Sequence, residues 1–299
     1  MEINKELFNR PPLEVIDGIP VFSVSDRYTQ NYAKIATDHL AAMAPGADNP
    51  FIENELWECL EESTRNLIRK HLRPGCRVLD AGVGLGRVLA PFKEAELYGI
   101  DISIDYLSKA RDAGFGVAYA RIEDMPFKDS TFDMVVACDV LEHVIDLEAC
   151  CKALLKALKP GGTLIVRVPN MDDLAAYLDE SLPYEFIHVR SFDLSSLRLL
   201  FQKIHGMRYV EHLYVAPWFK DTLMKVRLLP IDSRLAKLAR EATGPDHPLW
   251  LLSKVTAVSN EEYRNWLFAL KTDNPSMYAA IAGELLEGLE INVVFTKPT

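Results

Sequence analysis

Acidic, thiol and imidazole side chains follow the apolar stretches of this chain, where they could bind a ligand or move a proton. Asp80 and Asp101 each end an apolar stretch, and Cys138, Asp139 and His143 follow a third one. A carboxylate accepts hydrogen bonds from ligand hydroxyl groups, and an imidazole exchanges protons near neutral pH. Cys138 is unattractive as a nucleophile, because no neighbour in the sequence clearly lowers the pKa of its thiol. The pattern favours a site for a hydroxylated ligand with an acid–base residue beside it.

Three glycines at a spacing of two follow Asp80: Gly82, Gly84 and Gly86. Glycine allows a sharp turn and lets a ligand approach the backbone without meeting a Cβ atom. An apolar helical pattern resumes after them, so the stretch predicts a buried strand, a tight turn and a helix N-terminus that offers backbone N–H groups. A dinucleotide loop of the form G-x-G-x-x-G is the competing interpretation, but the third glycine comes one residue early and position 87 is Arg.

Strands and helices are predicted to alternate from Cys76 onward, which is typical of right-handed crossovers and a doubly wound parallel sheet. Ligands bind such sheets at the carboxyl ends of the strands. Asp101 lies 19 residues after Gly82, a position from which a carboxylate can accept both ribose hydroxyls; a helix N-cap is the alternative role. The expected strands are 76–80, 96–101, 116–121, 132–138, 162–169, 208–216 and 291–295.

Four motifs between Val78 and Asn170 give the chain a family resemblance. They are D-x-G-x-G-x-G at 80–86, M-P-F at 125–127, V-L-E-H-V at 140–144 and L-K-P-G-G at 158–162. In this order and spacing the chain resembles the class I S-adenosylmethionine (AdoMet) methyltransferases, in the small-molecule branch related to the ubiquinone-biosynthesis enzymes. The resemblance implies a Rossmann-like, doubly wound, mostly parallel seven-stranded sheet with an antiparallel last strand.

The resemblance also implies a set of cofactor-binding residues. The glycine loop and Asp101 would hold the cofactor, and Ile102 would lie against the adenine. Arg121 stands where the family often has an acid, so Glu123 or the backbone of Ile122 is the expected contact to the adenine edge. The full expected set is Tyr28, Tyr32, Asp80, Gly82, Gly84, Gly86, Asp101, Ile102, Ile122, Glu123, Cys138 and Asp139.

Two tyrosines and two histidines of the expected site each allow two interpretations. Tyr28 and Tyr32 would cover the methionine end of AdoMet or simply pack the N-terminal cap. His143 is a candidate general base or a packing residue. His188 lies in a loop where relatives often place a histidine over the acceptor, and it is a candidate base or the donor of a hydrogen bond at the sheet edge.

Four regions are expected along the chain. Residues 1–73 form an N-terminal extension and helical cap, with one or two short strands around the Asp17-Gly18 turn, and residues 74–216 form the AdoMet-binding core. Residues 217–289 read as a mostly helical insertion over the acceptor site, and 290–299 supply the final strand of the core sheet. A structureless loop as long as 217–289 would be unusual in a compact domain.

Composition limits the partners. The formal net charge of −10 over 299 residues argues against a general nucleic-acid binder. No apolar run is long enough to span a membrane, and the five cysteines form no C-x-x-C pair, so neither a membrane span nor a metal site is expected. An odd cysteine count and no visible signal peptide suggest reduced thiols and a cytoplasmic location. The sequence leaves the oligomeric state undetermined.

The resulting hypothesis is an enzyme that moves a methyl group from AdoMet to an oxygen or nitrogen of a small-molecule acceptor. Two alternatives stay open at this stage: a non-catalytic AdoMet-binding scaffold or partner protein, and an NAD-linked oxidoreductase. The motifs do not identify the acceptor, whose specificity would lie in the cap, in the loop at 170–190 and in the insertion.

Overall fold

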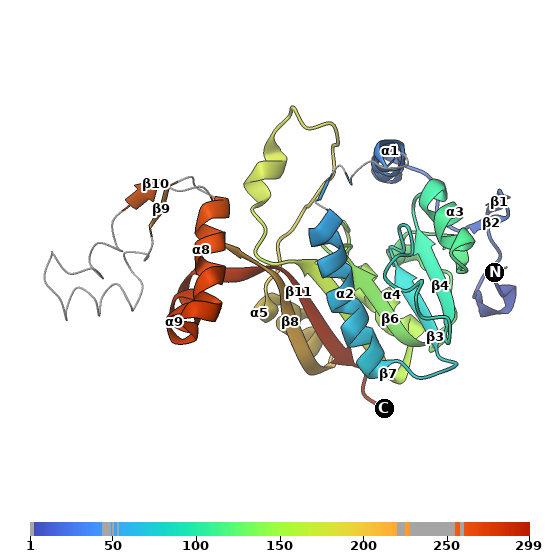
Figure 1. Cartoon of the computed structure of the whole chain (residues 1–299). Coiled ribbons are helices and arrows are strands. Elements are labelled where there is room, and N and C mark those ends of the chain that lie inside the picture. The colour runs from blue at the N-terminus through green and yellow to red at the C-terminus, as the bar shows by residue number, and fades with distance from the viewer. Residues whose placement is uncertain are drawn as a thin grey trace, which may run out of the picture. The chain divides into compact units, whose positions relative to one another are not determined.

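A computed structural model describes residues 3–43, 49, 51–52, 54–219, 225–227, 255–257 and 260–299 (Figure 1). The chain divides into two compact units, one made of Met1–Ala216 with Glu290–Thr299 and the other of Pro217–Leu289.

A nine-stranded sheet forms the first unit, in the order β1-β2-β5-β4-β3-β6-β7-β11-β8. The strands from β2 to β7 in this order run parallel, whereas β11 pairs antiparallel with β7 and β1 pairs antiparallel with β2. The predicted Rossmann-like sheet is therefore confirmed in the seven strands from β5 to β8. The bounds are β1 Glu14–Ile16, β2 Ile19–Val21, β3 Arg77–Ala81, β4 Glu96–Asp101, β5 Gly116–Tyr119, β6 Phe132–Cys138, β7 Leu158–Pro169, β8 Arg208–Phe219 and β11 Leu286–Thr296.

The two strands added at the sheet edge, β1 and β2, come from the N-terminal extension. Asp17 and Gly18 connect them with φ angles of 50° and 78°. Positive φ at both central residues is what a two-residue hairpin turn requires, and Asp-Gly supplies it readily. Val21 then pairs with Tyr119 of β5, which extends the parallel sheet by one short strand.

Helices cover the sheet and its carboxyl edge. The α-helices of the first unit are α1 Arg27–Ala42, α2 Asn54–His71, α3 Ile104–Asp112, α4 Leu147–Ala157 and α5 Leu194–Arg198. Short 3₁₀ turns are η1 Lys5–Leu7, η2 Ile122–Asp124 and η3 Leu174–Leu178, and the π-helical turn η4 spans Leu199–Ile204. Figure 1 shows α2 alongside β7 and β11, where Thr64 Oγ1 donates to Asn292 Oδ1 at 2.7 Å.

Two apolar cores lie on the opposite faces of the sheet, as a doubly wound fold requires. Alternate residues of one strand enter different cores: Leu79 of β3 belongs to one and Val78 to the other. In β6, Val135 and Val136 divide in the same way. Both faces of these strands are therefore buried, which explains why their sequences read as continuous apolar runs.

The helix expected directly after the glycine loop is absent, which corrects the sequence prediction for this segment. Residues 82–95 form successive turns, with single bonds such as Ala90 N–H to Gly86 O at 2.9 Å. Two features oppose a regular helix there. The glycines hold positive φ angles, and Pro91 lacks an N–H while disfavouring helical φ and ψ at Ala90.

The second unit contains two helices and a small sheet in its described residues. α8 spans Asn260–Asp273 and α9 spans Pro275–Leu285, whereas β9 Lys225–Arg227 pairs antiparallel with β10 Val255–Ala257. The strand pair was not predicted. Residues 220–224, 228–254 and 258–259 of the predicted insertion lie outside the described part of the chain. Among the described residues, no helix combines the length and the apolar character needed to cross a membrane.

Candidate functional site

A cavity of about 790 Å³ opens at the carboxyl ends of β3, β4, β5 and β6, where the sequence motifs meet. The residues predicted for the cofactor that line it are Tyr28, Tyr32, Asp80, Gly82, Gly84, Asp101, Ile102, Ile122, Glu123, Cys138 and Asp139. The two candidate bases, His143 and His188, line the same cavity. The fold thus brings segments from α1 to the loop after β7 around one space.

The glycine loop has one open position and two packed ones. The Cβ position of Gly82 would collide with Val140, and that of Gly86 would lie 2.9 Å from Phe115. Gly86 is also not among the residues that line the cavity, so its position indicates packing rather than the predicted cofactor contact. Gly84, by contrast, has nothing within 4 Å of its Cβ position and faces the cavity. A ligand can therefore approach the backbone at Gly84.

Asp101 fixes the shape of this loop. One carboxylate oxygen accepts a hydrogen bond from the N–H of Gly84 and the other from the N–H of Ser103, each at 2.9 Å. Burial raises the pKa of Asp101 to about 6, against the opposing effect of these backbone hydrogen bonds. The side chain stays beside the cavity, where its remaining lone pairs can accept hydroxyl groups.

Asp80 lies deeper at the end of β3. Its residue is 3% exposed, and burial together with the charge of Asp101 raises its pKa well above the ordinary value. Cys138 ends the neighbouring strand, β6. Burial raises the pKa of the Cys138 thiol far above its usual range, which agrees with the expectation that Cys138 is no nucleophile.

The two tyrosines of α1 cover the cavity from the cap. The hydroxyl of Tyr28 donates to the backbone oxygen of His143 at 3.3 Å, and that of Tyr32 donates to the backbone oxygen of Ile187 at 3.1 Å. Arg121 stacks over the Tyr28 ring at 4.8 Å and pairs with Asp26 at 2.9 Å. Arg121 thus fastens α1 to the core, and the tyrosines both pack the cap and line the cavity.

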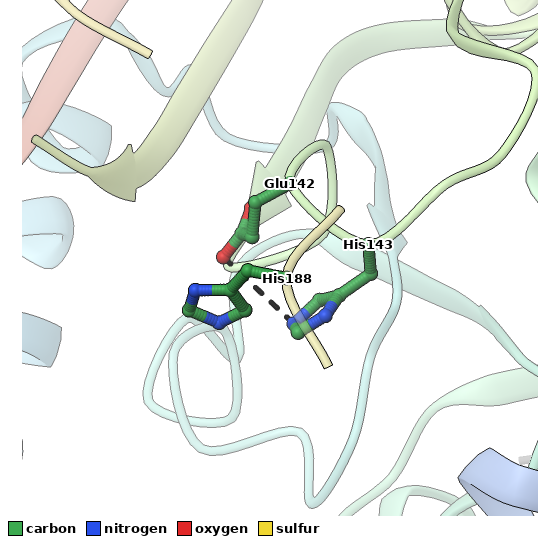
Figure 2. A group of neighbouring side chains, drawn as sticks. All are labelled: Glu142, His143 and His188. Carbon is green, nitrogen blue, oxygen red and sulfur yellow. Dashed lines mark ion pairs between the residues drawn. The ribbon is translucent and has the colours of Figure 1, made fainter. Parts of the chain in front are cut away.

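Three polar side chains form a cluster: Glu142, His143 and His188 (Figure 2). The two histidines line the cavity, and Glu142 lies beside them. The Nε2 atom of His143 is 3.8 Å from Oε1 of Glu142, and the two imidazole rings meet edge to face with centroids 4.8 Å apart. Burial, and then the neighbouring His188, lowers the pKa of His143 to about 4. His143 is therefore neutral at physiological pH.

His188 has an acidic partner that the sequence did not reveal. Its Nδ1 atom lies 2.5 Å from Oδ2 of Asp172, and the ring of Tyr177 packs against it with centroids 4.8 Å apart. Burial raises the pKa of Asp172, but the interactions with His188, together with hydrogen bonds from Tyr177 and the Asp173 backbone, outweigh this and leave the pKa below its usual value. Asp172 is thus a carboxylate that orients the imidazole.

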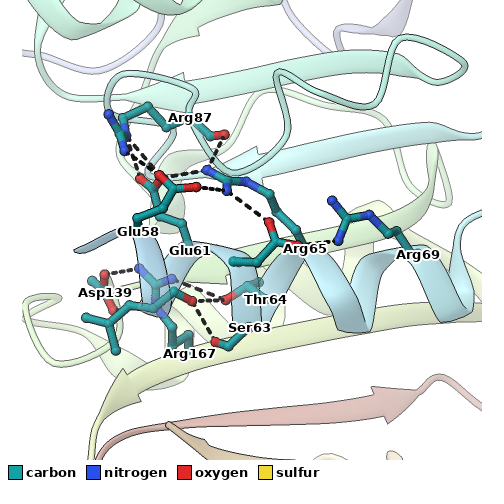
Figure 3. Close-up of polar contacts among 11 residues, drawn as sticks. Glu58, Glu61, Ser63, Thr64, Arg65, Arg69, Arg87, Asp139 and Arg167 are labelled. Carbon is teal, nitrogen blue, oxygen red and sulfur yellow. Dashed lines mark hydrogen bonds and ion pairs between the residues drawn. The ribbon is translucent and has the colours of Figure 1, made fainter. Parts of the chain in front are cut away.

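Helix α2 supplies a wall that the sequence analysis did not assign to the site (Figure 3). The guanidinium of Arg87 lies over the Trp57 ring at 3.8 Å and pairs with Glu61 at 2.9 Å. Glu61 also accepts from Arg65 at 2.7 Å. Arg65 is only 7% exposed and is therefore part of this network rather than of a solvated basic face.

A buried cation, Arg167, also escaped the sequence analysis. It lies on β7, binds the Asp139 carboxylate with two nitrogens, and pairs with Glu290 of β11 at 2.8 Å. Its third contact is Thr64 of α2 at 3.2 Å (Figure 3). No local motif marks Arg167, because its partners come from three distant segments. Asp139 is therefore held by a cation at the end of β6.

Comparison with known proteins agrees with the family that the sequence motifs indicate. The family model described as "Methyltransferase domain" matches residues 79–166. An uncharacterized protein of Methanocaldococcus jannaschii, MJ1123, is 30% identical over 53% of this chain and 67% of its own. Phosphoethanolamine N-methyltransferase 1 of Arabidopsis thaliana is 28% identical over 57% of this chain and 36% of its own length. The ubiquinone/menaquinone biosynthesis C-methyltransferase UbiE of Shewanella sp. is 33% identical over 43% of this chain and 52% of its own.

Two solved structures share the fold. A SAM-dependent methyltransferase of Thermotoga maritima superposes with a TM-score of 0.51 at 19% identity, over 90% of this chain and 99% of its own. The [4+2]-cyclase SpnF superposes with a TM-score of 0.51 at 17% identity, over 97% of this chain and 100% of its own. At these identities the likeness concerns the fold alone.

Three observations indicate the same kind of ligand: the open backbone at Gly84, the carboxylate of Asp101 and the matched methyltransferase domain. Gly84 leaves the space that a bound ligand needs, and Asp101 presents acceptor atoms beside it. These residues fit the adenosyl part of the cofactor that the motifs imply. The chain belongs to the class I S-adenosylmethionine-dependent methyltransferases, and its cofactor is S-adenosylmethionine.

Proposed function

We propose that this chain transfers the methyl group of AdoMet to an oxygen or nitrogen atom of a small-molecule acceptor. One observation carries the proposal: the cavity that contains Gly84 and Asp101 also contains the imidazoles of His143 and His188. A volume of about 790 Å³ is near the upper end of the range of about 300–1,000 Å³ that is common for ligand sites. The cavity is thus large enough for a cofactor with an acceptor beside it.

Each part of the cavity has a proposed task. AdoMet supplies a methyl group on a positively charged sulfur, so the methyl is already activated when the cofactor binds. The backbone at Gly84 and the Asp101 carboxylate hold the adenosyl part. Asp139, fixed by Arg167, lies at the end of β6 and presents negative charge toward the cavity. Tyr28 and Tyr32 close the cavity and exclude water from it.

The histidines differ in what they can do with a proton. A hydroxyl or an ammonium acceptor must lose a proton before or during methylation. His143, with a pKa of about 4, is a weak base. His188 donates its Nδ1 hydrogen to Asp172, which leaves the Nε2 lone pair available in the cavity. We therefore assign contact with the acceptor proton to His188, with Asp172 as its positioning residue.

The relatives differ in the atom that they name as acceptor. One printed name is that of an N-methyltransferase and another that of a C-methyltransferase, and the chain spans only part of each. The fold of SpnF, named as a cyclase, shows that this architecture also occurs with another activity. The second candidate is a protein of this fold that binds AdoMet without transferring its methyl group.

Two measurements test the proposal. Isothermal titration with AdoMet and with S-adenosylhomocysteine should show one site per chain, which Asp101→Ala weakens and the exposed Asp112→Ala on α3 leaves unchanged. Methyl-labelled AdoMet is then incubated with a panel of phenols, alcohols and amines, and the labelled position is found by mass spectrometry. Binding without label transfer to any acceptor would favour the non-catalytic binder, and label on carbon would contradict O- or N-transfer.

A further inference from the structure

Glu142, His143 and His188 bring three electron-pair donors together beside the cavity that the two histidines line (Figure 2). One ligand atom from each lies within 4.8 Å of those of the other two. Glu142 and His143 follow β6, whereas His188 comes from the loop after β7, 45 positions after His143. No spacing rule for metal ligands would find this set, which explains why no metal site was expected from the sequence.

Hydrogen bonding fixes which nitrogen of His143 is free. Its Nδ1 atom lies 2.9 Å from the backbone oxygen of Ile187. The Tyr32 hydroxyl lies 3.1 Å from the same Nδ1 atom and donates to the same Ile187 oxygen. A carbonyl oxygen only accepts hydrogen bonds, so with the Tyr32 hydroxyl directed at Ile187 the hydrogen of His143 lies on Nδ1. The Nε2 atom, which lies closer to Glu142, therefore presents a lone pair in the neutral imidazole.

The same argument applies to His188. Its Nδ1 atom donates to the Asp172 carboxylate at 2.5 Å, which leaves a lone pair on Nε2. Histidines that bind metals commonly donate their other ring N–H to a carboxylate or to a backbone carbonyl, which sets the tautomer and the ring orientation. His188 has the first kind of support, from Asp172, and His143 has the second, from Ile187.

Glu142 completes the set with a buried carboxyl group. The residue is 1% exposed, and neither of its carboxylate oxygens has a hydrogen-bond partner among the described residues. A buried polar group without a partner is costly, and buried charges are normally paired or bound to a metal.

We propose that Glu142, His143 and His188 bind one divalent metal ion of the zinc, iron(II) or manganese class. Two imidazoles with one carboxylate form the ligand set of catalytic zinc sites and of non-haem iron(II) sites, whereas magnesium prefers oxygen ligands alone. Metal bonds of about 2.1 Å place tetrahedral ligand atoms about 3.4 Å apart. The present separations of up to 4.8 Å require the side chains to move inward by about 1 Å on binding.

The role of this metal rests on the proposed function, although its binding does not. Three protein ligands leave at least one coordination position, and His143 and His188 line the cavity. A hydroxyl of the acceptor would bind there as an oxygen ligand. Coordination lowers the pKa of a bound hydroxyl, so the acceptor would give its proton to water as it enters, before the tyrosines close the cavity. With the metal bound, His188 would hold the ion through Nε2, and the proton contact assigned to it above would apply to the metal-free site only. The inference narrows the acceptor class to a hydroxyl compound.

The test uses the untagged full chain, freed of metal with a chelator and titrated with Co²⁺ alone and with Zn²⁺ alone. We expect one ion per chain, visible for Co²⁺ as the absorption of a nitrogen- and oxygen-ligated ion. Glu142→Gln and His188→Ala should each weaken binding more than about 100-fold, and Asp172→Asn about 10- to 100-fold through loss of the supporting hydrogen bond. His71→Gln removes a histidine that pairs with Glu211 on α2 outside the cavity lining, and should change nothing.

AdoMet titration of the same samples separates this inference from the proposed function. Metal-free protein that binds AdoMet, but shows no Co²⁺ or Zn²⁺ binding, would overturn the metal site and leave the methyltransferase proposal standing. Metal binding without AdoMet binding would support the metal site and overturn the methyltransferase proposal. Thermal melting of the wild-type chain avoids reliance on variants that fold poorly: Zn²⁺ should raise Tm, and an unchanged Tm at saturating Zn²⁺ would contradict the site.

Discussion

The carboxylate of Asp101 and the backbone N–H of Gly84 are joined by a 2.9 Å hydrogen bond that links the end of β4 to the glycine loop after β3. The bond holds the loop in the conformation that leaves space above Gly84, where the φ angle is 48°. Asp101 therefore has two tasks, shaping the loop and offering acceptor atoms to the ligand. Both tasks require the ionised carboxylate.

AdoMet affinity should consequently fall in mild acid. The folded-state pKa of Asp101 is raised to about 6, so protonation begins well above the range of an ordinary aspartate. If only the ionised form binds, affinity is constant above about pH 7 and about tenfold weaker at pH 5. Isothermal titration between pH 5 and pH 8 measures this. Asp101→Asn should bind weakly with a flat profile, and a wild-type profile that is equally flat would contradict the assignment.

The raised pKa of Asp101 affects the stability of the ligand-free chain in the opposite direction: stability falls as the pH rises, whereas AdoMet affinity increases. Because burial raises the folded pKa above the unfolded value, the contribution of Asp101 to stability is fully present below the unfolded pKa of 3.8 and is lost as the pH rises through about 6. AdoMet should therefore stabilise the chain most above pH 6. Tm measured with and without AdoMet at pH 5 and pH 7.5 gives the difference, which should be larger at the higher pH.

Two glycines of the loop should fail in different ways when they are replaced by alanine. Gly82→Ala places a methyl group against Val140 at a φ of 85° and should destabilise the fold by about 1–3 kcal/mol. Gly84→Ala meets no protein atom within 4 Å, so its cost should be mainly that of the positive φ, whereas its methyl group should weaken AdoMet binding. Gly75→Ala is the control, with a φ of 76° and no atom within 4 Å. Loss of AdoMet affinity in Gly75→Ala equal to that in Gly84→Ala would contradict the interpretation.

Local sequence patterns were sufficient for the core sheet, and they selected most of the residues that line the cavity around Gly84 and Asp101. Asp101 could be found because strand, acid and helix follow one another directly in the chain. The prediction of a helix after the glycines was wrong. The apolar spacing of this segment suits a helix, but the positive φ angles of the glycines and Pro91 prevent one. Periodicity reports which face is buried, and it does not report these backbone restrictions.

The other end of the cavity depends on contacts between distant segments. His188 was selected, but its partner Asp172 carried no signal, because the loop after β7 has no regular period. Glu142 belongs to the V-L-E-H-V motif, but the motif did not indicate that Glu142 would meet His188. Arg167 looked like an ordinary strand residue until β11 and α2 placed Glu290 and Thr64 against it. Such networks form only when distant segments pack together, so no single stretch of the sequence indicates them.

Arg87 should contribute to AdoMet binding by holding α2 at the cavity. Arg87→Ala removes the stacking on Trp57 and one ion pair of Glu61, both of which line the cavity. A cation–π contact of this kind contributes about 1 kcal/mol, so affinity for AdoMet should fall about fivefold. Arg69→Ala is matched, since Arg69 also pairs with a glutamate of α2, Glu62, but does not line the cavity. Equal losses of affinity in both variants would indicate a general effect on the helix.

Arg167 should contribute strongly to stability, and its contribution should depend on pH. Arg167→Met leaves Glu290 and Asp139 without their cation, and removal of one partner from a buried ion pair costs about 3–5 kcal/mol. Burial raises the pKa of Glu290 to about 8 even with Arg167 present, and loss of the cation raises it further. Below this pKa the carboxyl group is protonated and needs no partner, so the destabilisation should be smaller at pH 6 than at pH 9. Urea unfolding at both pH values measures it, with Arg77→Met, which breaks a half-exposed pair with Glu96, as the control expected to cost less than about 1 kcal/mol. A cost for Arg167→Met that is equal at the two pH values would show that the lost charge pairing is not the cause.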